Sequence, residues 1–258
     1  MPIKLLQWNI GGCLIRQPDA DPTNDDSYRE DGMAHVSDVI RRFDPDVITL
    51  QESYSNGTVQ AEEMARALGY PFVVNDRYDR SHLYDGQWLS QAVLSRFPIS
   101  DHSFELFYNP KFDLVRPNGQ RWISHDKGVT CCLLRLPNGQ DLELKTYHSI
   151  PLSVVDIAPS DERYLSLIRD MEHKLALTVS PAILAGDPNY DGVSLKPFLP
   201  SIFSSDDIKE IEQVAPTAPR GTRKDHIVYR GLRLISTTVA NDVLTDHYPV
   251  FAEFSLSE

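Results

Sequence analysis

Residues 182–189 read AILAGDPN, an unbroken apolar run that passes directly into a carboxylate and an amide. A short apolar run that ends at a turn signal is typical of a strand buried on both faces. Catalytic side chains are often found where a rigid strand gives way to a loop. We therefore predict a buried strand over residues 181–185 that presents Asp187 and Asn189 at one end of a sheet.

Other apolar runs have polar residues at their ends in the same way. These runs lie at 3–10, 46–51, 142–147 and 249–256. One polar residue after a strand is usually a loop residue or a cap, but two amides, four carboxylates and two imidazoles together indicate an active site. The candidate site residues are Asn9, Glu52, His148, Asp187, Asn189, Asp225, Asp246 and His247.

The remaining pattern places helices between strands. Apolar residues at helical spacing predict helices over 33–43, 59–68 and 160–177, with Thr58 and Ser160 as N-caps. Further strands are predicted at 92–94, 129–136, 226–229 and 232–239. Residues 13–32 read as a long loop, and Pro-Asn-Gly-Gln at 117–120 and 137–140 predicts two hairpin turns. Because no linker interrupts the pattern, we predict a single domain over 1–258 with two sheets and outer helices.

The composition restricts the class of protein. The chain has 258 residues and a formal net charge of -12, from 37 acidic and 25 basic residues. This balance weighs against a generally basic nucleic-acid-binding surface, although a bound cation and a few local Lys or Arg can reverse the field inside a cleft. The three cysteines form no CxxC pair and are expected to be reduced structural thiols.

No segment indicates secretion or membrane insertion. The N-terminus becomes polar too early for a signal peptide, and no apolar run approaches the ~20 residues of a membrane span. We therefore expect a cytoplasmic monomer with no membrane span.

The sequence motifs of several common enzyme classes are absent. The chain contains no GxxxxGK[ST], no HExxH and no GxSxG, which argues against a P-loop, a common zinc site and a serine hydrolase. The oxygen-rich candidate set suits Mg²⁺, which proteins hold through one or two carboxylates and a substrate phosphate. The candidate set is therefore of the kind that suits a Mg²⁺ site.

Five motifs in order resemble the endonuclease/exonuclease/phosphatase superfamily. They are QWNI at 7–10, LQES at 50–53, LSRFPI at 94–99, GDPN at 186–189 and TDHYPV at 245–250. The resemblance implies a DNase I-like, four-layer α/β sandwich, in which two facing and mostly antiparallel sheets are flanked by helices. It also implies hydrolysis of phosphate esters with Mg²⁺, for which Mn²⁺ can substitute.

The resemblance also implies roles for the residues on the metal side. Glu52 matches the principal Mg²⁺ ligand, Asn9 matches the asparagine beside it, and Asp246 matches a carboxylate near the metal. Lys127 is a candidate phosphate contact, like the arginine or tyrosine of relatives, and a solvated lysine is the open alternative.

A second group of residues matches the groups that act on water and phosphate. Asp187 matches the aspartate that orients or deprotonates the attacking water, and Asn189 matches its partner. His247 and His148 match two phosphate-contacting histidines. Asp225 matches the aspartate that pairs with the final histidine, which would raise the pKa of that imidazole.

The chain departs from the family pattern at several positions. Pro188 stands where phenylalanine is usual, and Tyr147 stands before the first histidine. His226 follows Asp225 and would face the opposite side of its strand, so we interpret it as structural. The carboxylate that usually partners the first histidine has no identified counterpart.

Three functions remain open on these residues. The first is a phosphodiesterase or nuclease that acts on nucleic acid or DNA ends, since GDPN and residues 223–230 look somewhat like tyrosyl-DNA phosphodiesterases. The second is a phosphatase or phosphodiesterase for a small molecule or lipid headgroup, and the third is an inactive binding module. Specificity is expected from residues 13–32 and from 101–127, whose ring and guanidinium side chains could stack on bases or pack against the core. These side chains are Tyr108, Phe112, Arg116, Arg121 and Trp122.

Overall fold

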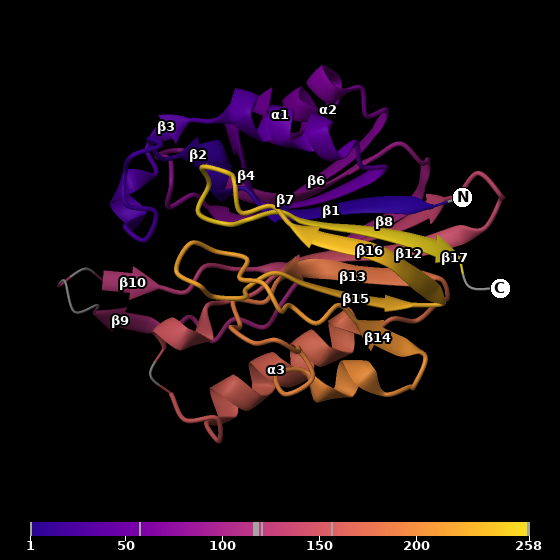
Figure 1. The fold of residues 1–258 in the computed structure, drawn as a ribbon. Coiled ribbons are helices and arrows are strands. Elements are labelled where there is room, and N and C mark those ends of the chain that lie inside the picture. The colour runs from indigo at the N-terminus through magenta and orange to yellow at the C-terminus, as the bar shows by residue number, and fades with distance from the viewer. Residues whose placement is uncertain (1, 57, 116–118, 120, 156, 257–258) are drawn as a thin grey trace.

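The computed structural model describes residues 2–56, 58–115, 119, 121–155 and 157–256. Two facing sheets form the centre, with helices α1 (Met33–Phe43) and α2 (Gln60–Leu68) on one outer face and α3 (Glu162–Leu175) on the other (Figure 1). This is the four-layer α/β sandwich that the sequence predicts. None of the helices in the described ranges is both long and apolar enough to cross a membrane.

The first sheet has β1 and β4 at its centre. Its strand order is β16 (Leu232–Val239), β17 (Val250–Leu256), β1 (Ile3–Asn9), β4 (Val47–Asn56), β7 (Trp88–Ser95) and β6 (Phe72–Arg80), with the short β5 (Thr58–Val59) paired to β4. The β1–β4 pair is parallel, and the other described pairs in this sheet are antiparallel.

The second sheet repeats this plan. Its strand order is β14 (Ile208–Glu210), β15 (His226–Arg230), β13 (Ala182–Asp187), β12 (Asp141–His148), β11 (Gly128–Arg135) and β8 (Ile99–Leu106). The β12–β13 pair is parallel, and the other described pairs are antiparallel. Each sheet therefore has a central parallel pair, whose strands end together at one edge.

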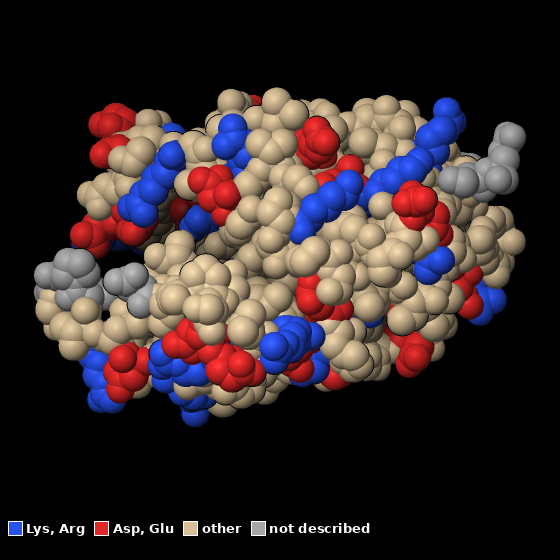
Figure 2. All heavy atoms as spheres, turned by 90° about the horizontal axis from the view of Figure 1, so that it is seen from below, with Lys and Arg blue, Asp and Glu red and all other residues tan. Residues whose placement is uncertain are grey.

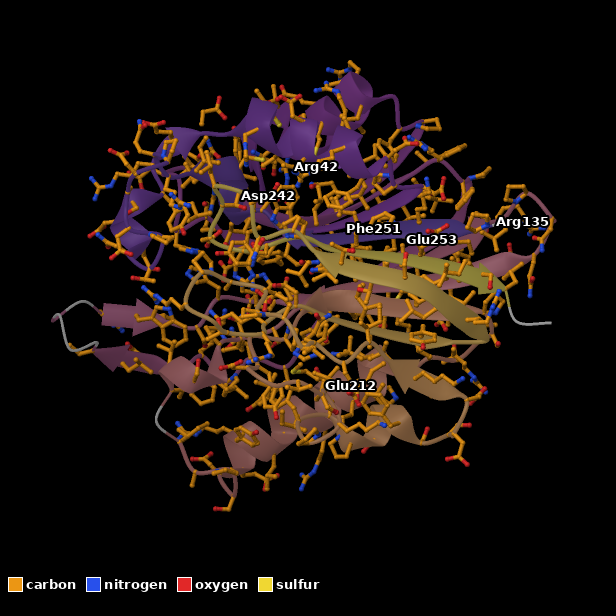
Figure 3. The ribbon with its side chains drawn as sticks, in the orientation of Figure 1. Arg42, Arg135, Glu212, Asp242, Phe251 and Glu253 are labelled. Carbon is orange, nitrogen blue, oxygen red and sulfur yellow. The ribbon has the colours of Figure 1, made fainter. Side chains whose placement is uncertain are left out.

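Three apolar layers hold the sandwich together. Between the sheets, Leu5, Ile183 and Phe254 belong to one buried apolar cluster. Beneath α1 and α2, a second layer includes Ile40 and Met64. The third layer lies under α3, whose buried residues are Leu167, Met171 and Leu175. An ion pair between Arg42 of α1 and the loop residue Asp242, 2.9 Å between Nη2 and Oδ1, joins the outer helix to the chain before β17 (Figure 3).

Smaller elements gather at the end of the sandwich where the parallel strands finish. The 13–32 loop contains β2 (Leu14–Ile15), η2 (Asp25–Ser27) and β3 (Glu30–Asp31), and it follows η1 (Gly11–Cys13). A hairpin of β9 (Asp113–Val115) and β10 (Arg121–Ile123) projects at the same end (Figure 1). The other short helices are η3 (Leu152–Val154) and η4 (Pro200–Phe203).

Helix α1 spans the predicted 33–43, whereas the starts of α2 and α3 differ from the predictions. Thr58 belongs to β5 and does not cap α2, whose N-cap position is Val59. Helix α3 begins at Glu162, and its cap is Asp161, whose carboxylate accepts a hydrogen bond from the Arg163 backbone. A carboxylate is as good a cap as a hydroxyl, so two adjacent candidates could not be separated from the sequence.

The strand predictions found the edge strand β16 over the predicted 232–239 but missed three other edge strands, including the short β14. Strands β6 and β8 were not predicted, and β7 begins four residues before the expected Ala92. Residues of edge strands are partly exposed, so they carry no apolar run to detect. The turn at 137–140 is confirmed by the β11–β12 hairpin, whereas residues 117, 118 and 120 of the other predicted turn lie outside the described residues. All three cysteines are free, as expected.

Candidate active site

The candidate site lies where the central parallel strands end. β1 ends at Asn9, and β12 and β13 end with His148 opposite Asp187. Glu52 lies at an irregularity of the β4–β7 pairing, with a positive φ of 55° that turns its side chain out of the regular alternation. Two sheets therefore present polar groups to the same edge.

A buried polar layer between the sheets supports this edge. Thr49 Oγ1 donates to Gln7 Oε1 over 2.6 Å, and Gln51 Nε2 donates to Thr146 Oγ1 of the opposite sheet over 2.8 Å. Gln7 Nε2 also lies 3.3 Å from Asp225 Oδ1. Buried polar groups with satisfied partners fix their neighbours in one arrangement, so this layer holds the two sheets in register beneath the site.

Asp187 occupies the meeting point of the two sheets. Asn9 Nδ2 donates to its Oδ2 over 2.9 Å, and the Asn189 backbone N–H donates to its Oδ1 over 2.7 Å. Burial raises the pKa of Asp187, and the nearby His247 opposes that effect. This combination favours a carboxylate that is oriented and can accept a proton.

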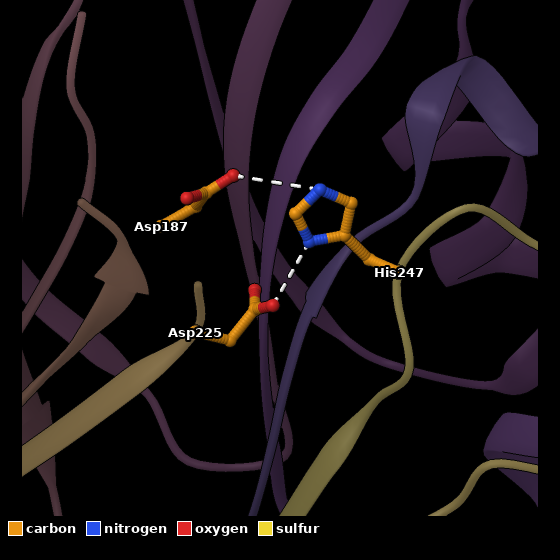
Figure 4. Close-up of side chains that lie close together, drawn as sticks. All are labelled: Asp187, Asp225 and His247. Atoms are coloured by element: carbon orange, nitrogen blue, oxygen red, sulfur yellow. Dashed lines mark hydrogen bonds and ion pairs between the residues drawn. The ribbon is translucent and has the colours of Figure 1, made fainter. Parts of the chain in front are cut away.

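His247 is held by a carboxylate partner (Figure 4). Its Nδ1 donates to Asp225 Oδ2 over 2.9 Å, and its Nε2 lies 3.8 Å from Asp187 Oδ2. Burial lowers the pKa of His247, but the charge and hydrogen bond of Asp225 outweigh it and raise the pKa to about 10. The ring is therefore an imidazolium that points at Asp187.

His148 has different partners. Lys127 Nζ lies 2.9 Å from Nδ1, the Tyr78 hydroxyl lies 3.3 Å from Nδ1, and Asn189 Nδ2 lies 3.0 Å from Nε2. The Lys127 ammonium and the Asn189 amide nitrogen are hydrogen-bond donors. If both ring nitrogens of His148 were protonated, their N–H groups would face these donors and could not form hydrogen bonds with them. Burial and Lys127 together hold the pKa of His148 well below its usual range. His148 is therefore a neutral imidazole.

Lys127 is buried beside Glu52. Its Nζ lies 3.5 Å from Glu52 Oε1, and burial lowers the pKa of its ammonium. Burial would raise the pKa of Glu52, but Lys127 and the surrounding histidines hold it well below its usual range. Glu52 is thus an ionised carboxylate, as a metal ligand must be.

Asp246 provides a test of whether a metal fits. Burial raises the pKa of Asp246 to about 6, and Oδ1 has no hydrogen-bond partner within the described part of the chain. Gly11 has a φ of +49°, and a Cβ added there would lie 2.6 Å from this oxygen. A buried carboxylate oxygen without a partner, beside a space that only glycine leaves open, fits a cation ligand.

A second group of side chains is also close enough to hold a metal. Among the described residues, ligand atoms of Asp187, Asp225 and His247 lie within 4.8 Å of one another, and all three residues are buried. Asp225 and His247 are already joined by a hydrogen bond, so a metal there would have to displace it. The unpartnered oxygen of Asp246 makes the Glu52–Asp246 side the better candidate.

The polar groups open into one cleft of about 910 Å³. Seven of the eight predicted residues line it, and Asp225 lies behind His247, fully buried. Asp25 of the 13–32 loop and residues 112–115 also line the cleft, so both segments from which specificity is expected reach it. On the face seen in Figure 2, acidic and basic side chains are interspersed, without a continuous basic stripe.

The rings and guanidinium groups of the 101–127 segment have different places. Phe112 is buried in the layer under α3, and Arg121 pairs with Asp113. Tyr108 is exposed, and Trp122 lines a second hollow together with Lys127. Arg116 lies outside the described residues.

Sequence reasoning missed two contributors, Tyr78 and His82, of which His82 lines the cleft and the hollow beside it. Tyr78, which reaches His148, lies on the unpredicted strand β6, so no strand-end signal pointed to it. His226 is buried, and its Nε2 lies 3.1 Å from the Arg223 carbonyl oxygen, which agrees with a structural role.

Comparison with known proteins supports the resemblance. The model of the Endonuclease/Exonuclease/phosphatase family matches residues 6–247. A UPF0294 protein of Vibrio parahaemolyticus is 24% identical over 183 residues, which make up 68% of this chain and 63% of that protein. The chain therefore spans less than two thirds of the length of the curated relatives it matches.

Solved structures share the fold. An endonuclease/exonuclease/phosphatase from Beutenbergia cavernae matches with a TM-score of 0.76 at 17% identity, covering 99% of this chain and 72% of that one. The mannosyl-6-phosphatase of Bacteroides thetaiotaomicron matches with a TM-score of 0.61 at 16% identity, covering 98% and 100%. D. rerio TDP2 complexed with single strand DNA product matches at 0.56 and 13%, covering 98% and 99%. At these identities the likeness shows the fold alone.

Proposed function

The chain belongs to the endonuclease/exonuclease/phosphatase family of phosphoesterases, and on that premise we propose that it is a Mg²⁺-dependent phosphodiesterase acting on nucleic acid or DNA ends. The observation that carries the proposal is the position of Asp187. Asn9 and Asn189 orient its carboxylate, and the cationic ring of His247 faces it from 3.8 Å. A base and a cation on either side of one small space suit in-line attack of water on phosphorus.

Each group has one role in this scheme. Asp187 accepts the proton of the attacking water. His247, held by Asp225, stabilises negative charge on a non-bridging phosphoryl oxygen. Asn189 positions the phosphate or the water beside His148, and the Lys127 ammonium adds positive charge at the other side of Glu52.

Glu52 and Asp246 would hold the metal, with the side-chain Oδ1 of Asn9 beside them. This oxygen already accepts a hydrogen bond from the Gly11 backbone N–H over 3.1 Å and keeps a second lone pair. A bound Mg²⁺, or Mn²⁺ in its place, would act as a Lewis acid on the phosphoryl oxygens.

The shape of the site favours a diester over a monoester. A second hollow shares Glu52, His148 and Asn189 with the main cleft. A phosphate bound at these residues would therefore have space on two sides, which suits a phosphorus atom that carries two organic groups.

A second candidate function is hydrolysis of a small-molecule or lipid-headgroup phosphate. The acidic net charge favours this candidate, because it weighs against a generally basic surface for nucleic acid.

The test is a hydrolysis screen with Mg²⁺ or with EDTA. The panel contains single- and double-stranded DNA, RNA, 5′-tyrosyl DNA, nucleotides and inositol phosphates. We expect Mg²⁺-dependent cleavage of a nucleic-acid diester, which Glu52→Gln and Asp187→Asn each reduce by ~10²-fold or more. Glu212→Gln, at an exposed carboxylate outside the cleft lining, is the matched control (Figure 3).

Two results would change the proposal. Full activity in both site variants would show that these carboxylates are not the reactive groups. Cleavage of small-molecule or inositol monoesters, with nucleic acids left intact, would replace the nuclease assignment with the second candidate.

A further inference from the structure

A second hollow of about 340 Å³ opens beside the main cleft. It shares Glu52, His82, His148, Pro151 and Asn189 with that cleft. Its own lining residues are Trp122, His125 and Lys127. Because its floor is the candidate phosphate site, a group that fills it would be bonded to the phosphate or lie next to it. We call this hollow the aromatic chamber.

The chamber takes its name from three ring side chains that come from two separate segments. His82 lies in the loop after β6, Trp122 lies in β10, and His125 follows that strand. The rings of His82 and His125 have centroids 5.2 Å apart and are tilted by 35°. Rings from different segments therefore converge on one small volume.

These walls are anchored. Trp122 is partly buried and packs against the apolar layer under α3, which includes Phe112. His125 Nδ1 lies 3.4 Å from Asp79 Oδ2, and the same oxygen accepts the Asp126 backbone N–H over 2.7 Å. A ring held in place loses little conformational entropy when a ligand stacks on it, which makes it an effective binding surface.

We propose that the aromatic chamber binds a planar aromatic group carried by an ester substituent of the scissile phosphate, so that it sets substrate specificity. This inference rests on the proposed phosphodiesterase function. The volume lies within the range of about 300–1,000 Å³ that is usual for small-ligand pockets. Indole and imidazole rings stack on planar π systems, and Lys127 places a cation near the floor.

The main cleft differs from the chamber in its apolar lining. Leu114, Val115 and Val154 of its lining are aliphatic, and its aromatic residue Phe112 is buried in the layer under α3. A planar group is thus better matched by the chamber, whether it is a nucleobase or a phenolic ring.

The test measures binding with ligands that cannot be hydrolysed, by calorimetry in the presence of Mg²⁺. Phenylphosphonate is compared with cyclohexylphosphonate, and 5′-deoxythymidine 5′-phosphonate with its base-free analogue. We expect the planar member of at least one pair to bind about 10-fold more tightly, as one stacked ring usually contributes. Preference in the first pair identifies a phenolic ring, and preference in the second identifies a nucleobase.

Variants show whether the chamber is responsible. Trp122→Leu and His82→Ala should each reduce the preference, and Trp122→Phe should keep most of it. Tyr108→Leu, at an exposed aromatic residue that lines neither hollow, should leave the preference unchanged. Because His82 is exposed, its replacement avoids the folding risk of the Trp122 variants.

The inference fails if neither pair differs in the wild-type protein, or if the preference survives both Trp122→Leu and His82→Ala. Hydrolysis of bis(p-nitrophenyl) phosphate, measured separately, reports on the proposed function. Hydrolysis without ring preference rejects the chamber alone. Ring preference that depends on Trp122, without any hydrolysis, rejects the phosphodiesterase assignment and leaves the chamber as a binding site.

Discussion

The two histidines of the site have opposite surroundings. His247 precedes β17 of the first sheet and donates to Asp225, next to β15 of the second sheet. His148 ends β12 of the second sheet, and Tyr78 of the first sheet reaches it. Both rings are buried, yet the pKa of His247 is raised and that of His148 is lowered.

The difference shows that burial alone does not decide the charge of an imidazole. Burial disfavours the cation in both places, and at His247 the charge and hydrogen bond of Asp225, together with the charges of Asp187 and Asp246, outweigh it. Donors surround His148, and its two nearby carboxylates, Glu52 and Asp187, each lie 3.7 Å from Nε2. One site thus contains a cationic and a neutral histidine, and the proposed mechanism therefore assigns charge stabilisation to His247 and Lys127.

Replacement of Asp225 by Asn should have the largest effect on this difference. The variant keeps the shape but removes the negative charge that holds the His247 cation, so kcat should fall by about 10²-fold. Steady-state kinetics on the best substrate of the screen would measure it. Asp242→Asn, at an exposed carboxylate paired with Arg42, is the control, and an unchanged kcat in Asp225→Asn would refute the role of the pair.

Replacement of Lys127 by Met should reduce activity less than Asp225→Asn does, and it should change the pKa of His148. Removal of the nearby ammonium allows the pKa of His148 to rise and removes one positive charge from the site, so kcat/KM should fall by about 10-fold. Kinetics together with a histidine titration by NMR would show both changes. A lysine that is only solvated would produce neither.

The substitution Gly11→Ala should weaken metal binding, and it should change the pKa values of His148 and His247 less than the two preceding substitutions do. The added Cβ would lie 2.6 Å from Asp246 Oδ1, at a φ of +49° that alanine adopts at a cost of about 1–2 kcal/mol. A several-fold higher Mg²⁺ requirement and a lower melting temperature are expected. Gly139→Ala has a similar backbone strain and nothing within 4 Å, so it separates strain from crowding.

The smallest perturbation is a change of pH on the metal-free wild-type protein. The pKa of His247 is raised from 6.5 to about 10, so its pairing stabilises the fold fully below about pH 6.5. This contribution is lost as the pH rises toward 10. NMR at pH 7.5 should show His247 protonated and His148 neutral. If both rings titrated near pH 6.5, their pKa values would not be shifted in opposite directions and the comparison would be wrong.

Local patterns predicted much of the fold and the site. Apolar runs identified the central strands, because strands buried on both faces need continuous apolar sequence. The polar residues at their ends identified the candidate set, of which seven line one cleft. Strands β6 and β8 were missed because their edge positions leave them polar, and Tyr78 was missed with β6.

The sequence by itself determined the buried strands, the order of the family motifs and the residue types at the strand ends, because these depend on local periodicity and composition. The family resemblance predicted the pairing of Asp225 with His247 and the raised pKa of that ring, whereas only the tertiary structure decided the partners of His148 and its neutral charge. Asp225 reaches His247 across 22 residues, and Tyr78 reaches His148 across 70. Such partners are selected by how the two sheets face each other, and the field at a buried ring depends on every charge that this packing brings close.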